Sequence, residues 1–343
     1  MTYHKDIAPI DYRIPAERQN AKRHYGVHPY FTRRPYNVVR DYILRYSQAG
    51  DLVIDPFGGS GVTAIEAMLA GRTGVQNDIN PLANFIAKSI ADLRQGKASE
   101  YGDALLNLRG LCEARLGALQ GMSERQIATL LSKLPLPKNV ELPGNSDVDH
   151  YRDLFLPRQL AALAILREAI DRLRNRPAHR AMLVAWSATL TKLNRTFLSA
   201  EGRAESRGGS SIFSIYRYKV AKRPVELPPW ETFFERAQNV IAAKLEMDTL
   251  VTANAKAQKG SFVVESKDVD ELAESYKGKV DYIFTDPPYG GHISYLDLST
   301  LWNCWLGIMP SQKARECELI VGGELKHSES LYITRLGESI GKC

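Results

Sequence analysis

A strand, a glycine turn and a helix follow one another in the stretch Asp51-Leu52-Val53-Ile54-Asp55-Pro56-Phe57-Gly58-Gly59-Ser60-Gly61-Val62-Thr63. The apolar residues before the turn favour a strand, and residues 63–70 have high helix propensity. Three glycines at the turn permit positive φ and a close backbone approach to a ligand. A second short strand is expected at 73–77. The stretch therefore predicts a β-α-β unit and an α/β fold.

Two acids mark the ligand side of this unit. Asp78 ends the second strand about 20 residues after the turn, where a carboxylate commonly binds ribose hydroxyls. Asp55 lies at the turn itself, where it would repel a pyrophosphate but suits an ammonium or sulfonium cation. The absence of Lys between Asp55 and Ala87 argues against a Walker A loop, and Gly-Gly-x-Gly is not the dinucleotide spacing. S-adenosylmethionine carries both cations and fits this turn.

A second motif, Asp286-Pro287-Pro288-Tyr289, ends the strand expected at 281–285. An amino group on a nucleobase is a poor nucleophile, because its lone pair is delocalised into the ring. The Asp286 carboxylate and the Pro287 carbonyl are suited to accept its two N–H bonds and favour a pyramidal nitrogen. The prolines restrict the backbone that carries these acceptors. Tyr289 is suited to stack on a flipped base. Taken alone, Asp-Pro-Pro is more often an ordinary turn at the end of a strand.

Together, the two motifs resemble those of S-adenosylmethionine-dependent amino methyltransferases. Further blocks are similar to adenine-specific DNA methylases of bacteria and archaea, and they lie at 28–35, 155–160, 294–299 and 305–306. The group with the greatest similarity often carries a zinc ribbon. Here no C-x-x-C pair occurs, so neither a ribbon nor a metal site is expected among the four cysteines, Cys112, Cys304, Cys317 and Cys343.

This resemblance implies a Rossmann-like methyltransferase sheet, S-adenosylmethionine as cofactor and DNA as substrate. The implied reaction is methylation of the N6 amino group of adenine, in a restriction-modification or defence context. The motif Asp286-Pro287-Pro288-Tyr289 would be catalytic. The loop before the first strand would close over the methionine part of the cofactor, and the end of a third strand, expected at 260–266, would meet its adenine. The implied cofactor-binding residues are Thr32, Asp55, Pro56, Phe57, Gly58, Gly59, Gly61, Thr63, Asp78, Ile79, Ser266 and Asp268.

Three other functions remain open at this point. N4-cytosine methylation of DNA uses nearly the same pocket, often with Ser in place of Asp286. N2-guanine methylation of RNA also uses an Asp-Pro-Pro-Tyr motif, although the further blocks speak against it. The third is an inactive DNA-binding subunit of a split methyltransferase complex.

Basic residues cluster in two regions of a chain whose net charge is +6. One lies in the first 40 residues, and the other lies at 203–223, next to a glycine-rich run. A basic surface attracts the phosphate backbone of nucleic acids, although many such surfaces are only solvated. The residues predicted to contact DNA are Arg33, Arg34, Arg207, Arg217 and Lys219.

The chain divides into three predicted parts. Residues 1–95 hold a basic N-terminal segment and the cofactor-binding half of the methyltransferase domain. Residues 96–259 form a mainly helical insertion, a candidate for DNA recognition, and residues 260–343 form the catalytic half. Helices are expected at 35–47, 80–92, 101–118, 123–132, 157–174, 178–193, 230–246 and 328–340, with a helix-like apolar run at 295–306.

Few strands are expected after the catalytic motif. The sheet of such enzymes normally continues there, whereas here only residues 319–321 resemble a short strand. We therefore expect a truncated or naturally split methyltransferase whose C-terminal strands come from a second polypeptide. In the alternative, the insertion supplies the missing strands. No apolar run approaches 18 residues and the N-terminus does not resemble a signal peptide, which predicts a cytoplasmic protein without a membrane partner.

Overall fold

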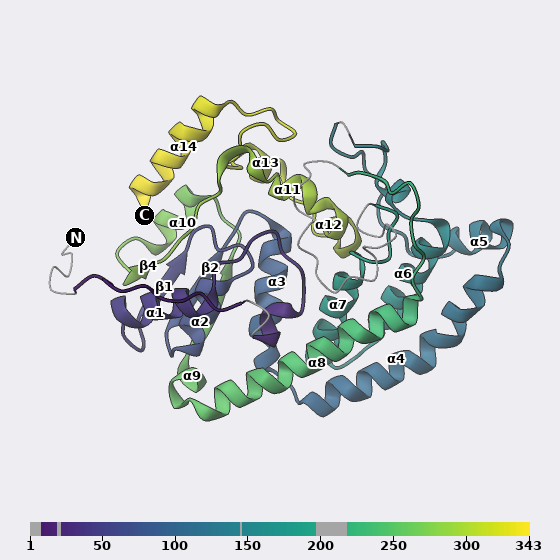
Figure 1. Cartoon of the computed structure of the whole chain (residues 1–343), viewed down its shortest axis with the longest axis horizontal. Coiled ribbons are helices and arrows are strands. Elements are labelled where there is room, and N and C mark those ends of the chain that lie inside the picture. The colour runs from purple at the N-terminus through teal and green to yellow at the C-terminus, as the bar shows by residue number, and fades with distance from the viewer. Residues whose placement is uncertain (1–7, 19–21, 145, 197–217) are drawn as a thin grey trace.

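A small parallel sheet lies at the centre of one half of the molecule (Figure 1). The computed structural model describes residues 8–18, 22–144, 146–196 and 218–343. Within them the strand order is β3-β2-β1-β4, and every pairing is parallel. The strands are β1 Leu52–Asp55, β2 Thr73–Asn77, β3 Ser261–Glu265 and β4 Tyr282–Ile283. The predicted Rossmann-like α/β fold is confirmed. Because parallel strands end at the same edge, β1 and β4 carry the two sequence motifs to one side of the sheet.

The two faces of the sheet are covered unequally. Val53 of β1 joins the large apolar core, which also includes α2 and α3 side chains. Its neighbour Ile54 points to the opposite face and packs with Val75 and with Leu272 of α10 in a second, much smaller core. The sheet face covered by α2 and α3 therefore has a much thicker apolar layer than the face covered by α10.

Helices account for most of the remaining described chain. The longer ones expected from sequence are present, but α8 extends well beyond the predicted 230–246, and the run at 295–306 breaks at Ser299 into two short helices. The α-helices are α1 Tyr36–Tyr46, α2 Val62–Leu69, α3 Pro81–Ala91, α4 Ala98–Ala118, α5 Glu124–Leu131, α6 Pro157–Ile170, α7 Arg176–Thr189, α8 Pro229–Ala253, α9 Ala255–Lys259, α10 Val269–Tyr276, α11 Tyr295–Leu298, α12 Thr300–Leu306, α13 Gln312–Glu316 and α14 Glu329–Lys342. Short 3₁₀ helices are η2 Arg23–Gly26, η3 Asp92–Arg94, η4 Leu119–Gly121, η5 Tyr151–Leu154 and η7 Gly290–His292.

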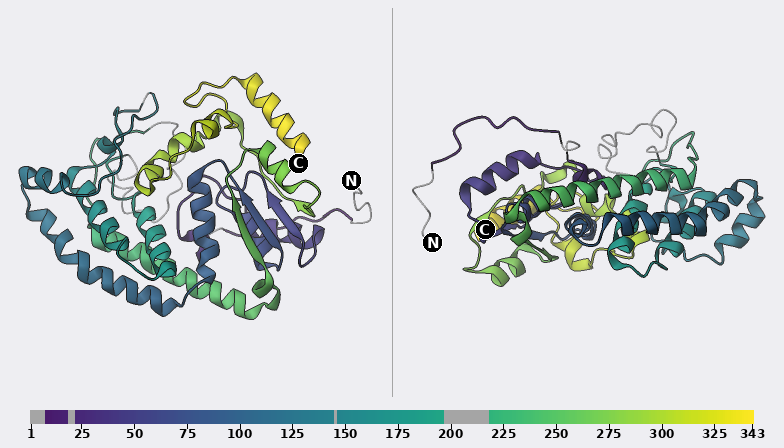
Figure 2. Two further views of the ribbon diagram at one scale, coloured as in Figure 1. Left: turned by 180° about the vertical axis from the view of Figure 1, so that it is seen from behind. Right: turned by 90° about the horizontal axis from the view of Figure 1, so that it is seen from below.

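The helices between β2 and β3 form a layered extension beside the sheet. In Figures 1 and 2, α4 and α8 run alongside each other, and α8 returns the chain to α9 and β3. Buried residues such as Trp186 of α7 and Phe233 of α8 share one continuous core with α2 and α3. In the described part of this extension, no strand joins the sheet. The alternative in which the insertion supplies the missing strands is therefore wrong for these residues.

Among the described residues, β4 is an edge strand. Tyr46 of α1 stacks on Tyr282 with ring centres 5.7 Å apart, and Tyr42 packs edge-on against Phe284. Residues 319–321, considered above as a short strand, have no strand conformation, because buried Leu319 and Ile320 belong to a loop between α13 and α14. None of the helices in the described chain is long and apolar enough to cross a membrane.

Candidate active site

The glycine turn after β1 is packed too tightly for side chains at key positions. Gly59 and Gly61 have φ of +51° and +88°, values that favour glycine. A Cβ atom on Gly61 would also lie only 2.5 Å from the Cβ atom of Ala87. The predicted role of these glycines therefore has a structural basis: they let the backbone turn sharply between β1 and α2 with the ligand side left open.

Asp55 connects this turn to the catalytic motif. Its carboxylate accepts hydrogen bonds from the hydroxyls of Thr63 and Thr285, each at 2.7 Å, and from the backbone N–H of Phe57 at 3.1 Å. Thr63 belongs to α2, and Thr285 directly precedes Asp286. Burial raises the pKa of Asp55 to about 6, although these hydrogen bonds oppose the shift. Asp55 therefore fixes the position of one motif relative to the other.

Asp78 organises the other side of the turn. Its carboxylate accepts hydrogen bonds from the backbone N–H groups of Gly59 at 2.9 Å and Asn80 at 2.8 Å. Burial raises the pKa of Asp78 to about 7. The Asn80 side chain caps α3 and also donates to Ser299, which ties the cofactor side to the helices after the catalytic motif.

The predicted catalytic motif, Asp286 to Tyr289, is more exposed and is held by polar contacts. Arg34 forms two hydrogen bonds of 2.5 Å with the Asp286 carboxylate, and the Tyr289 hydroxyl donates to both carboxylate oxygens at 2.6 Å. The hydroxyl of Tyr332 on α14 donates to the carbonyl of Pro288 at 2.7 Å. Tyr289 is 44% exposed.

These groups line one cavity of about 270 Å³. It brings together the predicted catalytic residues, the turn and Thr32, whereas Gly61 and Ser266 are not among its lining residues. Gly61 lies beneath the turn and Ser266 is exposed. The predicted residues that line the cavity are Thr32, Asp55, Pro56, Phe57, Gly58, Gly59, Thr63, Asp78, Ile79, Asp268, Asp286, Pro287, Pro288 and Tyr289.

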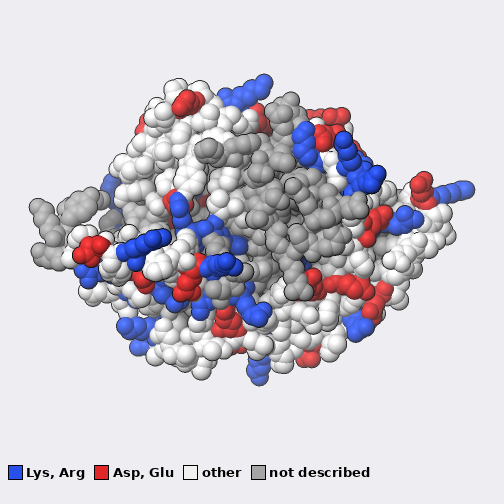
Figure 3. Space-filling view, in the orientation of Figure 1, with Lys and Arg blue, Asp and Glu red and all other residues white. Residues whose placement is uncertain are grey.

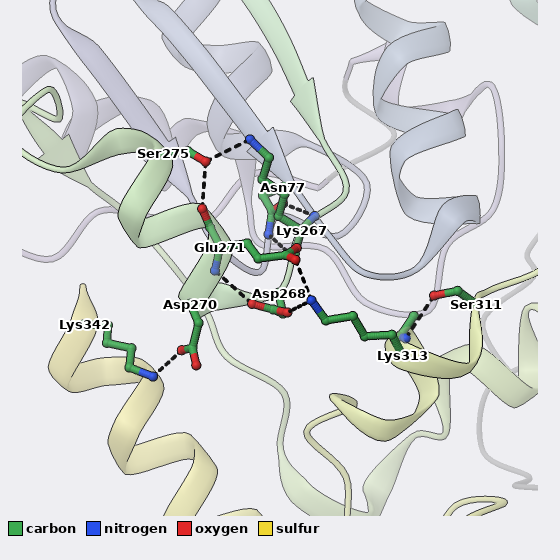
Figure 4. Close-up of polar contacts among 10 residues, drawn as sticks. Asn77, Lys267, Asp268, Asp270, Glu271, Ser275, Ser311, Lys313 and Lys342 are labelled. Atoms are coloured by element: carbon green, nitrogen blue, oxygen red, sulfur yellow. Dashed lines mark hydrogen bonds and ion pairs between the residues drawn. The ribbon is translucent and has the colours of Figure 1, made fainter.

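Asp268 lines the cavity but already has several partners. It caps α10 by accepting from the Glu271 N–H, and Lys313 of α13 lies 2.7 Å from its carboxylate. Figure 4 shows this contact together with the ion pair between Lys342 of α14 and Asp270. Asp268 therefore helps attach the C-terminal elements to α10, besides facing the cavity.

Sequence reasoning missed an acid on the far wall of the cavity. Glu318 is buried, accepts the N–H of Leu296 at 3.1 Å, and has its pKa raised to about 8 by burial. Tyr30 and Tyr295 also line the cavity, with ring centres 6.4 Å apart. The short apolar run at 319–321, next to Glu318, indicated that this segment is buried. Nothing in the sequence indicated that Glu318 would face this cavity.

The described residues that were predicted to contact DNA have different surroundings. Arg33 donates to Ser60 and to the carbonyls of Tyr25 and His28, each at 2.7 Å, which favours a structural role over the predicted DNA contact. Arg34 is exposed and pairs with Asp286. Lys219 is exposed and lies 2.6 Å from Asp147. Arg207 and Arg217 lie outside the described residues. Figure 3 shows Lys and Arg side chains gathered left of centre on one face.

Residues 5–88 match the N6/N4 methyltransferase family, described as DNA methylase. The chain is similar to this family over that segment. The resemblance stated from the motifs is therefore confirmed for this segment. The matched segment contains Asp55, the turn and Asp78, and it ends well before Asp286.

A relative shows the same regional similarity. The chain is 34% identical over 79 residues to the type II methyltransferase M.MjaII of Methanocaldococcus jannaschii. That alignment covers 23% of this chain and 15% of the relative. The comparison with solved structures gives no match. The matched family segment does not include residues 260–343, the predicted catalytic half.

Proposed function

We propose that this protein transfers a methyl group from S-adenosylmethionine to the N6 amino group of adenine in DNA. The observation that carries the proposal is the position of Asp55, which accepts hydrogen bonds from α2 and from Thr285 beside Asp286. The cofactor turn and the acceptor motif consequently form one site. The match of residues 5–88 to a family described as DNA methylase supports the same reaction class.

The cavity has the chemistry that this cofactor needs. Bound S-adenosylmethionine supplies a methyl group on a positively charged sulfur. Asp55 and Asp78 provide negative charge at the turn, and Gly58 and Gly59 expose backbone without side chains to obstruct it. Asp78 is proposed to hold the ribose, and Asp55 the methionine end, directly or through water. Thr32, Ile79 and Asp268 are proposed to line the remainder of the cofactor pocket.

The catalytic motif is proposed to orient the amino group. The Asp286 carboxylate and the Pro287 carbonyl accept its two N–H bonds, and Tyr289 stacks on the base. With S-adenosylmethionine bound, the nitrogen lone pair would form the new N–C bond, and the cofactor would keep the S–C electrons and leave as a thioether. One N–H proton leaves through Asp286 to water. Positioning and electrostatics supply the rate enhancement, without a covalent enzyme intermediate.

The preference for adenine rests on Asp286, since N4-cytosine enzymes often have Ser at this position. DNA is proposed to approach over the exposed Arg34, and Arg207 and Arg217 remain predicted contacts. The similarity to a type II methyltransferase supports a restriction-modification role. Completion of the sheet by a second polypeptide stays a proposal.

The test is transfer of labelled methyl from S-adenosylmethionine to unmethylated DNA, followed by digestion to nucleosides and mass spectrometry. N6-methyladenine is expected with the wild type and is expected to be lost in Asp286→Ala. Asp171→Ala, which removes an exposed acid paired with Arg167, is the control. N4-methylcytosine as the product would overturn the adenine assignment, and methylation of RNA alone would overturn DNA as the substrate. Cofactor binding without transfer to either nucleic acid would favour an inactive subunit.

A further inference from the structure

Arg34 occupies the acceptor position of the catalytic motif. Its Nε and Nη2 atoms lie 2.5 Å from the two Asp286 carboxylate oxygens, so the guanidinium meets the carboxylate through a two-pronged contact. The guanidinium carbon also lies 5.6 Å from the centre of the Tyr289 ring, and Arg34 contacts the Tyr289 hydroxyl. The acid and the ring proposed for the target base therefore already have an occupant from the same chain.

The occupant resembles the edge of a nucleobase. A guanidinium is flat, presents several N–H donors in a fixed geometry and stacks on aromatic faces. The exocyclic amino group of a base needs the same carboxylate, and the base needs the same ring. Arg34 and the target base are therefore competitors for one site.

The ion pair between Arg34 and Asp286 lies where another ligand can replace Arg34. The Arg34 and Asp286 side chains are 51% and 31% exposed, so solvent and an incoming ligand can reach both partners of the ion pair. The neighbouring Arg33 is the opposite case, because its three interior hydrogen bonds fix the loop to Ser60 and to the segment before it. The Arg34 side chain can thus leave while its backbone stays anchored.

We propose that Arg34 is a place-holder for the target base. It is a positioning residue that keeps the Asp286 carboxylate and Tyr289 oriented until a base with matching N–H donors displaces it. The inference rests on the proposed function, since a flipped base is what Arg34 stands in for. Its displacement places a positive charge beside the incoming DNA, which couples base entry to contact with phosphate.

Isolated bases test the competition without any contribution from phosphate. The probes are 9-methyladenine and 1-methylcytosine, with the protein saturated with S-adenosylhomocysteine so that the cofactor side is filled. Saturation-transfer NMR titration would give Kd for wild type, Arg34→Ala and Arg109→Ala. Arg109 is a matched control: it is 55% exposed and makes a two-pronged contact with Glu113 at 2.9 and 3.1 Å. We expect at least threefold tighter binding of one base by Arg34→Ala, and wild-type affinity for Arg109→Ala.

Unchanged or weaker binding of both bases by Arg34→Ala would overturn the place-holder. The contact itself is followed by the NMR signal of the Arg34 Nε–H group, which should move in Asp286→Asn and stay in Glu113→Gln. If the Asp286→Asn substitution left the chemical shift of the Arg34 Nε–H signal unchanged, the place-holder proposal would also be overturned. Neither readout involves methyl transfer, so a wild type that fails to methylate DNA would count against the proposed function while these measurements still decide the role of Arg34.

Discussion

The two motifs lie in one cavity but are held in different ways. Around the first motif, every residue of α2 is buried and the turn is packed against Ala87 and Gln76. Around the second, β4 is a two-residue edge strand, and α14, which reaches the cavity, has no buried residue. The first region combines close packing with the hydrogen bonds of Asp55 and Asp78, whereas the second has more exposed hydrogen bonds and ion pairs, such as those in Figure 4. We therefore expect a rigid side, which is proposed to bind the cofactor, and an adaptable side, which is proposed to bind the base.

The largest expected effect is on chemistry at the exposed side. Asp286→Asn replaces the carboxylate by an amide that accepts hydrogen bonds less strongly, and we expect methyl transfer to fall about 100- to 1000-fold, the usual cost of one lost electrostatic contact. S-adenosylmethionine affinity should stay within about threefold of wild type on the same argument, because Asp55 and Asp78 remain in place. Single-turnover rates and calorimetric Kd values measure both. A parallel loss of cofactor binding would show that the two sides are not separable.

The next effect contrasts one added methyl group on each side. A Cβ atom at Gly74 in β2 would lie 2.0 Å from the Ala64 carbonyl, whereas at Gly291 the nearest atom is 3.4 Å away. We expect Gly74→Ala to lower the free energy of unfolding by about 3 kcal/mol, since this core cannot yield. Gly291→Ala should change it by less than about 1 kcal/mol. Urea denaturation compares the two, and equal losses would contradict the proposed difference in packing.

The sequence predicted the rigid side well and the adaptable side only in outline. The strand, turn and helix at 51–70 are local signals, so the motif, the short strands and the positions of Asp55 and Asp78 followed from neighbouring residues. The ion pair of Arg34 with Asp286 joins residues more than 250 positions apart, and Glu318 reaches the cavity from a loop without periodicity. Such contacts depend on tertiary packing, which a pattern along the chain does not contain. The hydrogen bonds of Arg33 to Ser60, Tyr25 and His28 were missed for the same reason.

Cofactor affinity should depend on pH through the rigid side. Burial raises the pKa of Asp55 to about 6 and of Asp78 to about 7, both from a usual value of 3.8. An acid with a raised pKa in the folded state destabilises the free protein as pH rises from about 4 to 7, because the unfolded chain ionises more readily. A cationic ligand needs the ionised carboxylates, so S-adenosylmethionine should bind at least about tenfold more tightly at pH 8 than at pH 5.

Calorimetric titrations at several pH values measure this dependence, with Asp78→Asn as the control. That variant should show a shallower dependence, since only Asp55 then titrates at the turn. Affinity that is constant, or that rises toward pH 5, would show that these carboxylates do not face the cation.

The smallest expected effect comes from removing one hydroxyl on each side. Tyr25 is 2% exposed and donates to buried Glu66 at 2.8 Å, whereas Tyr332 donates to the Pro288 carbonyl at 2.7 Å from a helix with no buried residue. Tyr25→Phe leaves a buried carboxylate short of a donor and should cost about 1–2 kcal/mol of unfolding free energy, whereas water can replace the Tyr332 hydroxyl and Tyr332→Phe should cost about 0.5 kcal/mol. Each variant lacks only one hydroxyl oxygen. The difference between their unfolding free energies, measured by chemical denaturation, therefore reports on the surroundings of the two hydroxyls. If Tyr332→Phe is the more costly, α14 is part of the rigid structure, and the base side is then held as firmly as the cofactor side.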